Sequence, residues 1–202
     1  MRYGDVDFDW DNRVDTTWSN IHWRTRVREV LTGRPYQPSD PLTFHEIMET
    51  LPIDFREFTF IDLGSGKGRA LLMASDYPFR KIIGVELLPE LHVIAQENVQ
   101  QYSSDRQQCP SFELQCCEAR EFKLPVEPLV IFMFDPFPPD ILREVLGGIE
   151  RSVRESSRRV LIAYQNPISE DVFREFASFK KIAGTIAYAI FEVAAQTLQG
   201  KS

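Results

Sequence analysis

A doubly wound α/β sheet, mostly parallel and preceded by a helical N-terminal extension, is the fold that this sequence predicts. From Phe58 onward, short β-rich runs alternate with helical stretches, as in parallel strands joined by right-handed crossovers. The run from Leu129 to Phe134 is six apolar residues long, which is typical of a strand buried on both faces. A glycine-rich segment separates the first strand from the first helix, the place where such sheets bind ligands.

The expected strands are short and rich in apolar residues. They cover 58–63, 81–86, 112–116, 129–134 and 159–164, and a hairpin-like pair over 179–186 and 188–193 closes the chain. Apolar periodicity predicts helices over 69–76, 89–102, 141–149 and 170–176. In the extension, Asp40 and Pro41 are a typical N-cap and first helical residue, and Trp23, Val27, Val30 and Leu31 predict an earlier helix.

Length and composition suit one globular unit with an extension. The chain has 202 residues, of which 43% are hydrophobic and 26% are charged. We expect a helical extension over 1–55, covering the cofactor and substrate side, and a core over 56–202. The net charge of −7 makes nucleic acid an unlikely partner, because phosphate backbones are repelled.

Cellular location and metal content are also predicted from the sequence. No signal peptide or membrane-spanning stretch is expected, which favours a cytoplasmic protein without a membrane partner. Cys109, Cys116 and Cys117 lack a second ligand group at zinc spacing, so no metal site is expected. The oligomeric state is left open.

The glycine segment runs from Asp62 to Arg69 and reads D-L-G-S-G-K-G-R. A dinucleotide site needs G-x-G-x-x-G, but the third glycine comes one residue early; a P-loop needs Ser or Thr where Gly68 stands. Asp62 before the loop and Glu86 at the end of the second strand fit a ligand with an amino-acid end and a ribose, because a carboxylate accepts two hydrogen bonds from a diol.

These residues, with Gly84-Val85-Glu86, resemble motif I and the second-strand acid of class I S-adenosylmethionine-dependent methyltransferases. The resemblance covers about 58–193 and implies a seven-stranded Rossmann-like sheet and S-adenosyl-L-methionine as cofactor. The loop is similar to those of non-SET histone-lysine and small single-domain lysine methyltransferases, and the whole chain resembles uncharacterised bacterial members. Tyr36-Gln37-Pro38-Ser39 resembles the segment that precedes the core in the small enzymes.

The resemblance implies a cofactor-binding set drawn from five segments. It comprises Tyr36, Ser39, Asp62, Gly64, Ser65, Gly66, Gly68, Glu86, Leu87, Glu118 and Ala119. The glycines and Asp62 surround the methionine part, which Tyr36 and Ser39 close. Glu86 holds the ribose, and Leu87, Glu118 and Ala119 face the adenine.

Several of these positions have a plain structural alternative. Glu121 aligns with the adenine position about as well as Glu118, and Leu87 is equally typical of core. Tyr36 and Ser39 also fit a turn and a helix cap. We interpret Lys67 and Arg69 as charges at the start of a helix that face solvent.

Asp135 ends the fourth strand, where the resemblance places it beside the methyl group and the incoming nucleophile. The segment from Asp135 to Pro138 departs from the Asp/Asn-Pro-Pro-aromatic signature of base and amide methylation, since Phe137 comes one residue early. This argues against those substrates and leaves a carboxylate that orients an amine. No histidine falls in these motifs, so we name no general base.

The predicted function is S-adenosylmethionine-dependent methyl transfer to an amine, with a protein lysine ahead of a small molecule as acceptor. The alternatives are a small-molecule O-methyltransferase and a non-catalytic binding module with the same fold. The aspartates and tryptophans of the first 23 residues suit either a lid for a cationic group or a structural segment. The structural interpretation, with tryptophans packed on the sheet and aspartates facing water, is favoured.

Overall fold

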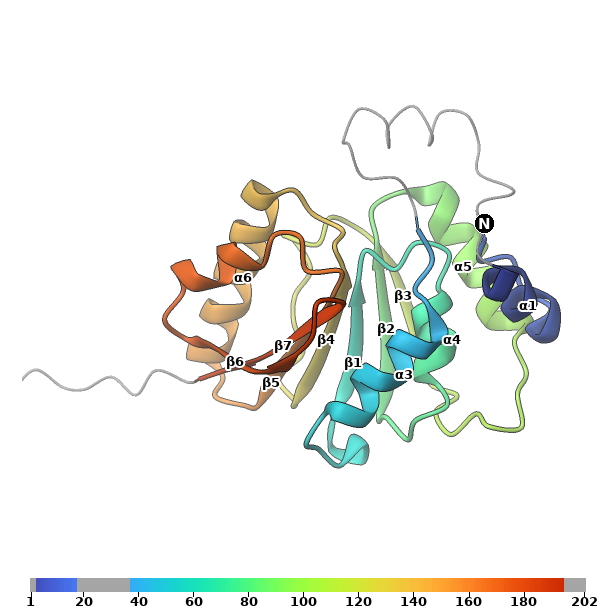
Figure 1. Cartoon of the computed structure of the whole chain (residues 1–202), viewed down its shortest axis with the longest axis horizontal. Coiled ribbons are helices and arrows are strands. Elements are labelled where there is room, and N and C mark those ends of the chain that lie inside the picture. Colours follow the sequence, from blue (N-terminus) through green and yellow to red (C-terminus); the bar gives the residue numbers. More distant parts are fainter. Residues whose placement is uncertain (1–2, 18–36, 195–202) are drawn as a thin grey trace, which may run out of the picture.

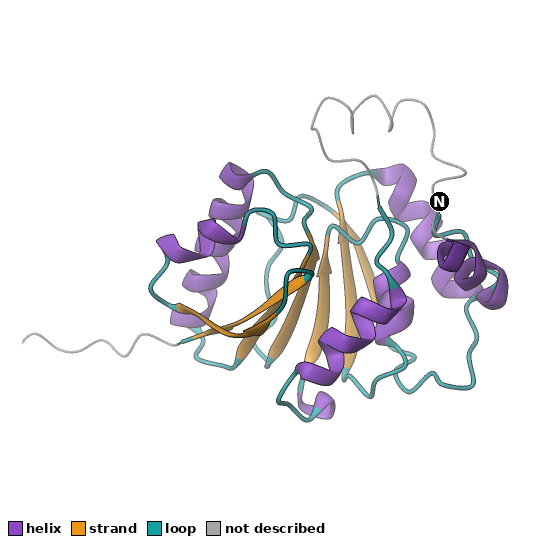
Figure 2. Ribbon diagram, viewed as in Figure 1, coloured by secondary structure: helices purple, strands orange, loops and turns teal. Residues whose placement is uncertain are grey.

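A seven-stranded sheet, with strand order β3-β2-β1-β4-β5-β7-β6, forms the centre of the protein (Figures 1 and 2). The computed structural model describes residues 3–17 and 37–194. Strand β7 runs antiparallel to β5 and β6, and the other pairs are parallel. The strands are β1 (Thr59–Leu63), β2 (Lys81–Glu86), β3 (Phe112–Cys116), β4 (Leu129–Phe134), β5 (Val160–Gln165), β6 (Phe179–Gly184) and β7 (Tyr188–Val193). The mixed, doubly wound sheet predicted from the sequence is therefore confirmed.

Helices cover both faces of the sheet (Figure 2). Buried residues of α3 and α4 join one apolar cluster with alternate side chains of β1, β4 and β5. Residues of α6 and η3 join a second cluster on the opposite face. The helices are α1 (Tyr3–Asn12), α3 (Pro41–Thr50), η2 (Phe55–Glu57), α4 (Arg69–Ala74), α5 (Pro89–Gln101), α6 (Pro139–Glu155) and η3 (Glu170–Glu175).

Local sequence explains why α3 starts where it does. The Asp40 carboxylate accepts a hydrogen bond from Thr43 N at 2.9 Å, which satisfies a free amide of the first turn. Pro41 follows at the first helical position, where its missing N–H costs nothing. Phe44, Ile47 and Met48 then form one fully buried stripe against the sheet.

The helices differ from the expectations in two places, and a third expectation is not tested by the described residues. Helix α1 was not expected, because its apolar residues form no clear stripe. The helix expected over 170–176 is the 3₁₀ helix η3, and the helix expected around Trp23 to Leu31 lies outside the described residues. No helix of the residues described, 3–17 and 37–194, is long and apolar enough to cross a bilayer.

The strand order reverses between β1 and β4, which lie side by side at the centre of the sheet. The chain leaves β1 toward β2 and β3 and leaves β4 toward β5, so the loops after the two strands diverge. A crevice at the carboxyl ends of the strands follows from this arrangement. It is the place where a doubly wound sheet binds its ligand.

Candidate active site

A cavity of about 340 Å³ lies at this switch point, between the glycine loop after β1 and the segment after β4. Its walls come from the ends of four strands and from the segment before α3. Nine of the twelve residues predicted for the site line it: Ser39, Gly64, Ser65, Gly66, Glu86, Leu87, Glu118, Ala119 and Asp135. The structure thus brings together segments spread over almost a hundred positions of the chain.

The other three predicted residues are not among the described residues that line the cavity. Gly68 forms the N-cap of α4, with a φ of +88°. Asp62 lies buried in β1, only 4% exposed. Tyr36 lies outside the described residues.

The glycine loop needs glycine for two separate reasons at Gly64. Its φ is +87°, a conformation that L side chains rarely adopt. A Cβ added there would lie 2.6 Å from Cβ of Pro136, closer than any real contact allows. The loop after β1 and the loop after β4 are therefore in direct contact, and the cavity opens beside this contact.

Glu86 is tied to the glycine loop by its own side chain. One carboxylate oxygen accepts a hydrogen bond from Gly66 N, and the other accepts one from Leu88 N, each at 2.8 Å. The residue is 7% exposed and lines the cavity. A carboxylate oxygen has more than one acceptor direction, so these backbone bonds orient Glu86 and leave it able to accept from a diol.

Asp62 lies in the strand just before the loop. Burial raises the pKa of its carboxyl well above the usual range, and the nearby charge of Glu86 raises this pKa further. An ionised Asp62 is therefore costly unless a cation reaches it.

After β3, Glu118 lines the cavity, whereas Glu121, the alternative to it, is exposed and does not line it. Glu118 accepts a hydrogen bond from Arg120 Nε at 2.6 Å. Leu87 also lines the cavity and is 44% exposed, so it is not core. The geometry favours Glu118 over Glu121 as the acid of this wall.

Asp135 follows β4 with a φ of +40°, which is uncommon for a residue with a side chain. Its carboxylate accepts a hydrogen bond from the hydroxyl of Tyr164 at 2.5 Å. Burial and the Asp135 carboxylate both raise the pKa of Tyr164, so its hydroxyl stays protonated and keeps donating. The sequence analysis did not identify Tyr164, because it lies in an apolar strand. Its position near the end of the strand that pairs with β4, next to Asp135, could have indicated it.

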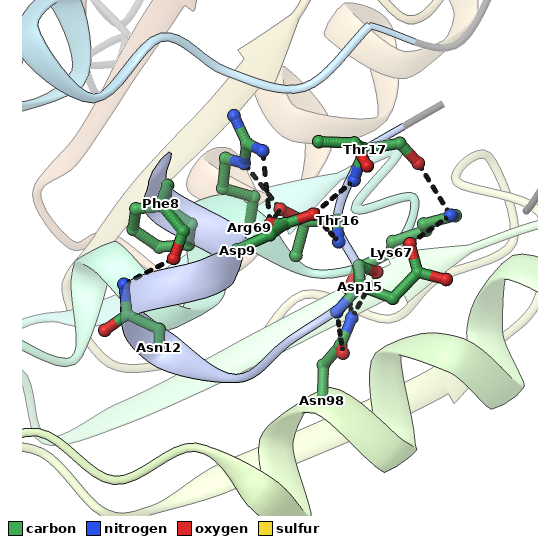
Figure 3. A network of polar contacts seen from close by, with 9 residues as sticks. All are labelled: Phe8, Asp9, Asn12, Asp15, Thr16, Thr17, Lys67, Arg69 and Asn98. Carbon is green, nitrogen blue, oxygen red and sulfur yellow. Dashed lines mark hydrogen bonds and ion pairs between the residues drawn. The ribbon is translucent and has the colours of Figure 1, made fainter. Parts of the chain in front are cut away.

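Lys67 and Arg69 are not solvent-facing, and this expectation was wrong. Lys67 is 0% exposed and Arg69 is 2% exposed. They form ion pairs with Asp15 and Asp9 of the N-terminal segment (Figure 3). Because these aspartates turn inward, the expectation that the N-terminal aspartates face water was wrong for both. Trp10, expected to pack on the sheet, is 83% exposed.

No family model matches this chain. A protein of Chlamydia muridarum (strain MoPn / Nigg), named an uncharacterized RNA methyltransferase, is 32% identical over 155 residues, or 75% of this chain. The chain spans about 37% of the length of this curated relative.

Solved structures share the fold at low sequence identity. An RNA methyltransferase from Salinibacter ruber, in complex with S-adenosyl-L-homocysteine, has a TM-score of 0.53 at 14% identity and covers 82% of this chain and 98% of its own. A glycopeptide N-methyltransferase complexed with S-adenosyl-L-methionine has a TM-score of 0.55 at 13% identity, covering 79% and 95%. The chain therefore has the Rossmann-like fold of the methyltransferases that bind S-adenosyl-L-methionine.

Proposed function

We propose that this chain, with its methyltransferase fold, transfers a methyl group from S-adenosyl-L-methionine to an amine nitrogen. The observation that supports the proposal most is the negative charge balance of the residues that line the cavity. Among the described residues that line it, three are acidic, Glu86, Glu118 and Asp135, and Arg69 is the single Lys or Arg. A concave site with a negative balance attracts a cation, and S-adenosyl-L-methionine carries a sulfonium centre.

The residues present fit this cofactor in three places. Asp62, buried in β1 directly before the glycine loop and outside the cavity wall, would favour the ammonium of the amino-acid end through its charge, because a nearby cation relieves the cost of that charge. Glu86 suits the ribose diol, since the backbone amides of Gly66 and Leu88 already orient it. Leu87, Glu118 and Ala119 suit the adenine.

The methionine end would be held by the loop and by the segment before α3. Gly64, Ser65 and Gly66 line the cavity there, and Gly68 caps the helix that follows. Ser39, 5% exposed, lines the same cavity, and Tyr36 completes the proposed set.

Asp135 is the proposed catalytic residue, at the acceptor side of the cavity. When bound, the cofactor supplies a methyl group on a good leaving group. The protein then has to align the amine and exclude water. A lysine amine has a reference pKa of about 10.4, so it must lose a proton before attack. Asp135, half-buried and fixed by Tyr164, would orient that amine beside Phe137 and the flanking prolines.

Calorimetry with S-adenosyl-L-methionine and S-adenosyl-L-homocysteine tests the cofactor assignment. We expect both to bind, and Glu86→Ala to weaken binding at least about tenfold through loss of charge-assisted hydrogen bonds. Glu90→Ala, which removes an exposed carboxylate at the start of α5, is the matched control. Absence of binding to the unaltered protein would overturn the assignment, and normal binding by Glu86→Ala would remove Glu86 from it.

Labelled cofactor and a lysate identify the acceptor class. A protease-sensitive labelled product supports a protein amine, with the modified atom then read from the peptide. A labelled extractable compound supports a small molecule, to be distinguished as N- or O-methylated. If no labelled product forms in any lysate while the cofactor still binds, the result supports the alternative of a non-catalytic binding module. Asp135→Asn is expected to keep cofactor affinity and to lose labelling.

An RNA is the second candidate acceptor, favoured by the name of the chlamydial relative. A ribonuclease-sensitive product would support it against the protein amine. The net charge of −7 and the acidic cavity weigh against a polyanion. For either acceptor, we retain as a proposal the division into an extension over 1–55 and a core over 56–202.

A further inference from the structure

The two cations of the glycine loop are removed from water. Lys67 and Arg69 stand on either side of Gly68 and are 0% and 2% exposed. A buried cation is costly unless it is paired and hydrogen-bonded. Since Arg69 also lines the cavity, whatever pairs these cations influences the shape of the ligand loop.

The partners come from the N-terminal segment, residues 3–17 (Figure 3). The ammonium of Lys67 donates to Asp15 Oδ1 at 2.8 Å and to the carbonyl oxygen of Thr17 at 2.6 Å. Arg69 donates through Nε to Thr16 Oγ1 at 2.6 Å and through Nη2 to Asp9 Oδ1 at 3.2 Å. Each cation therefore has its own acid.

The N-terminal segment is itself fixed in shape. Asp9 Oδ2 accepts hydrogen bonds from the amides of Thr16 and Thr17, at 2.7 and 2.8 Å, so the chain folds back over the end of α1. Asn98 of α5 accepts from Asp15 N and donates to the carbonyl oxygens of Asp15 and Lys67. One amide side chain thus links the segment to the glycine loop.

The N-terminal segment affects the cavity indirectly, through Lys67 and Arg69. Asp9, Asp15 and Thr16 are not among the described residues that line the cavity. They touch Lys67 and Arg69, which belong to a loop whose three glycines, Gly64, Gly66 and Gly68, all have positive φ. Glycine-rich backbone has much conformational freedom to lose on binding, so holding it in one shape beforehand strengthens affinity.

We propose that Asp9 and Asp15 are positioning residues for the glycine loop, which they hold ready for the amino-acid end of the cofactor. The inference rests on the proposed function, in which this loop surrounds the methionine part. Loss of either acid removes the ion-pair partner that the N-terminal segment gives to a buried cation, and this lets the loop move. Binding of the amino-acid end then weakens, whereas binding of the nucleoside, whose adenine contacts lie on Leu87, Glu118 and Ala119, is retained.

Two probes separate the ends of the cofactor. S-adenosyl-L-homocysteine carries the amino-acid end, and 5′-methylthioadenosine lacks it. We expect Asp15→Asn and Asp9→Asn to raise the dissociation constant of the first at least about tenfold and that of the second less than about twofold. Asp11→Asn, on the exposed side of α1, is the control and is expected to change neither.

Each result decides between the inference and the proposed function. Equal affinity of both acid variants and the unaltered protein for S-adenosyl-L-homocysteine overturns the inference alone. An equal loss for both probes overturns it as well, because the effect would then be on the whole fold. If the unaltered protein binds neither probe, the proposed function fails first and the inference with it.

Hydrogen exchange on the unaltered protein decides the case in which a variant does not fold. The amides of Thr16 and Thr17, bonded to Asp9, report the state of the segment. S-adenosyl-L-homocysteine is expected to slow their exchange at least about threefold, by coupling through the ion pairs. Unchanged exchange at saturating ligand overturns the inference.

Discussion

Two parts of the site are held in different ways: the glycine loop over 62–69, called the loop end, and the region of Asp135, called the acceptor end. At the loop end, Lys67 and Arg69 are fully buried and paired with acids from a distant segment. At the acceptor end, Asp135 is half-buried, and the bond from Tyr164 is a contact between neighbouring strands. Under the proposed function, the end that binds one invariant cofactor can be built rigidly, whereas the end that meets the acceptor has to stay open.

The largest effect is expected where both acids of the loop end are removed. Asp9→Asn with Asp15→Asn should lower the free energy of unfolding by about 3–5 kcal/mol, because two buried cations each lose an ion-pair partner. Asp7→Asn with Asp11→Asn changes the net charge equally at exposed positions and should cost less than about 0.5 kcal/mol. Urea unfolding measures both. Equal costs would mean that the loop end is held no more firmly than the surface.

Asp62→Asn is expected to separate stability from binding. The pKa of Asp62 is raised in the folded chain, so its ionised form destabilises that state once the pH passes the unfolded value of about 3.9. The variant should therefore be more stable by about 1 kcal/mol at pH 8, and this gain should disappear as the pH falls toward 4. Its affinity for S-adenosyl-L-homocysteine should fall about tenfold, because the attraction between the carboxylate and the ammonium is lost.

Urea unfolding at several pH values, followed by calorimetry, checks this prediction. A variant less stable than the unaltered chain at pH 8 would contradict the assigned cost of Asp62. A pH-independent gain would assign the effect to some other group.

Tyr164→Phe tests the acceptor end with a smaller change. Loss of its hydrogen bond to Asp135 should cost about 1 kcal/mol of stability and leave affinity for S-adenosyl-L-homocysteine within about twofold. Turnover should fall about tenfold, since Asp135 is no longer fixed against the acceptor. Tyr188→Phe, which removes a buried hydroxyl bonded to Thr50 and Glu46, is the control and should cost stability alone. Equal turnover in the two variants would remove Tyr164 from the site.

The smallest effect is expected at the wall that faces the adenine. Glu118→Gln should weaken S-adenosyl-L-homocysteine about threefold, because a half-exposed carboxylate contributes little. Glu121→Gln should have no effect on calorimetry, as Glu121 does not line the cavity. The reverse order of these two variants would show that the adenine lies against Glu121.

Most of the sheet could be predicted because its strands carry local signals. Four strands, β2, β3, β4 and β7, have the expected bounds; β1 and β6 shift by one or two residues at one end, and β5 shifts by one residue at both ends. The glycine loop was also predictable. Its glycine spacing does not fit a dinucleotide fingerprint or a P-loop, and its position between the first strand and the first helix is the usual ligand site of such a sheet. These features depend on residues that are close in sequence.

The parts that could not be predicted depend on distant partners. Lys67 looks like a surface charge until Asp15, 52 positions away, is placed against it. Tyr164 looks like core until strand pairing sets its strand beside the end of β4. Local pattern gives the type of each residue, but the partner that decides its burial is set by tertiary structure.

The contacts of Asn98 also determine when, during synthesis of the chain, the N-terminal segment can reach its folded position. Asp15 is made before Asn98, whose side chain accepts from its amide and stands 83 residues further along the chain, and Arg69, the partner of Asp9, is 60 residues further. Such separations delay contact formation, because closing a long loop costs entropy before any bond repays it. The segment over 3–17 must wait until α5 has been made, so the loop end of the cavity is completed only after β1, β2 and the helix between them.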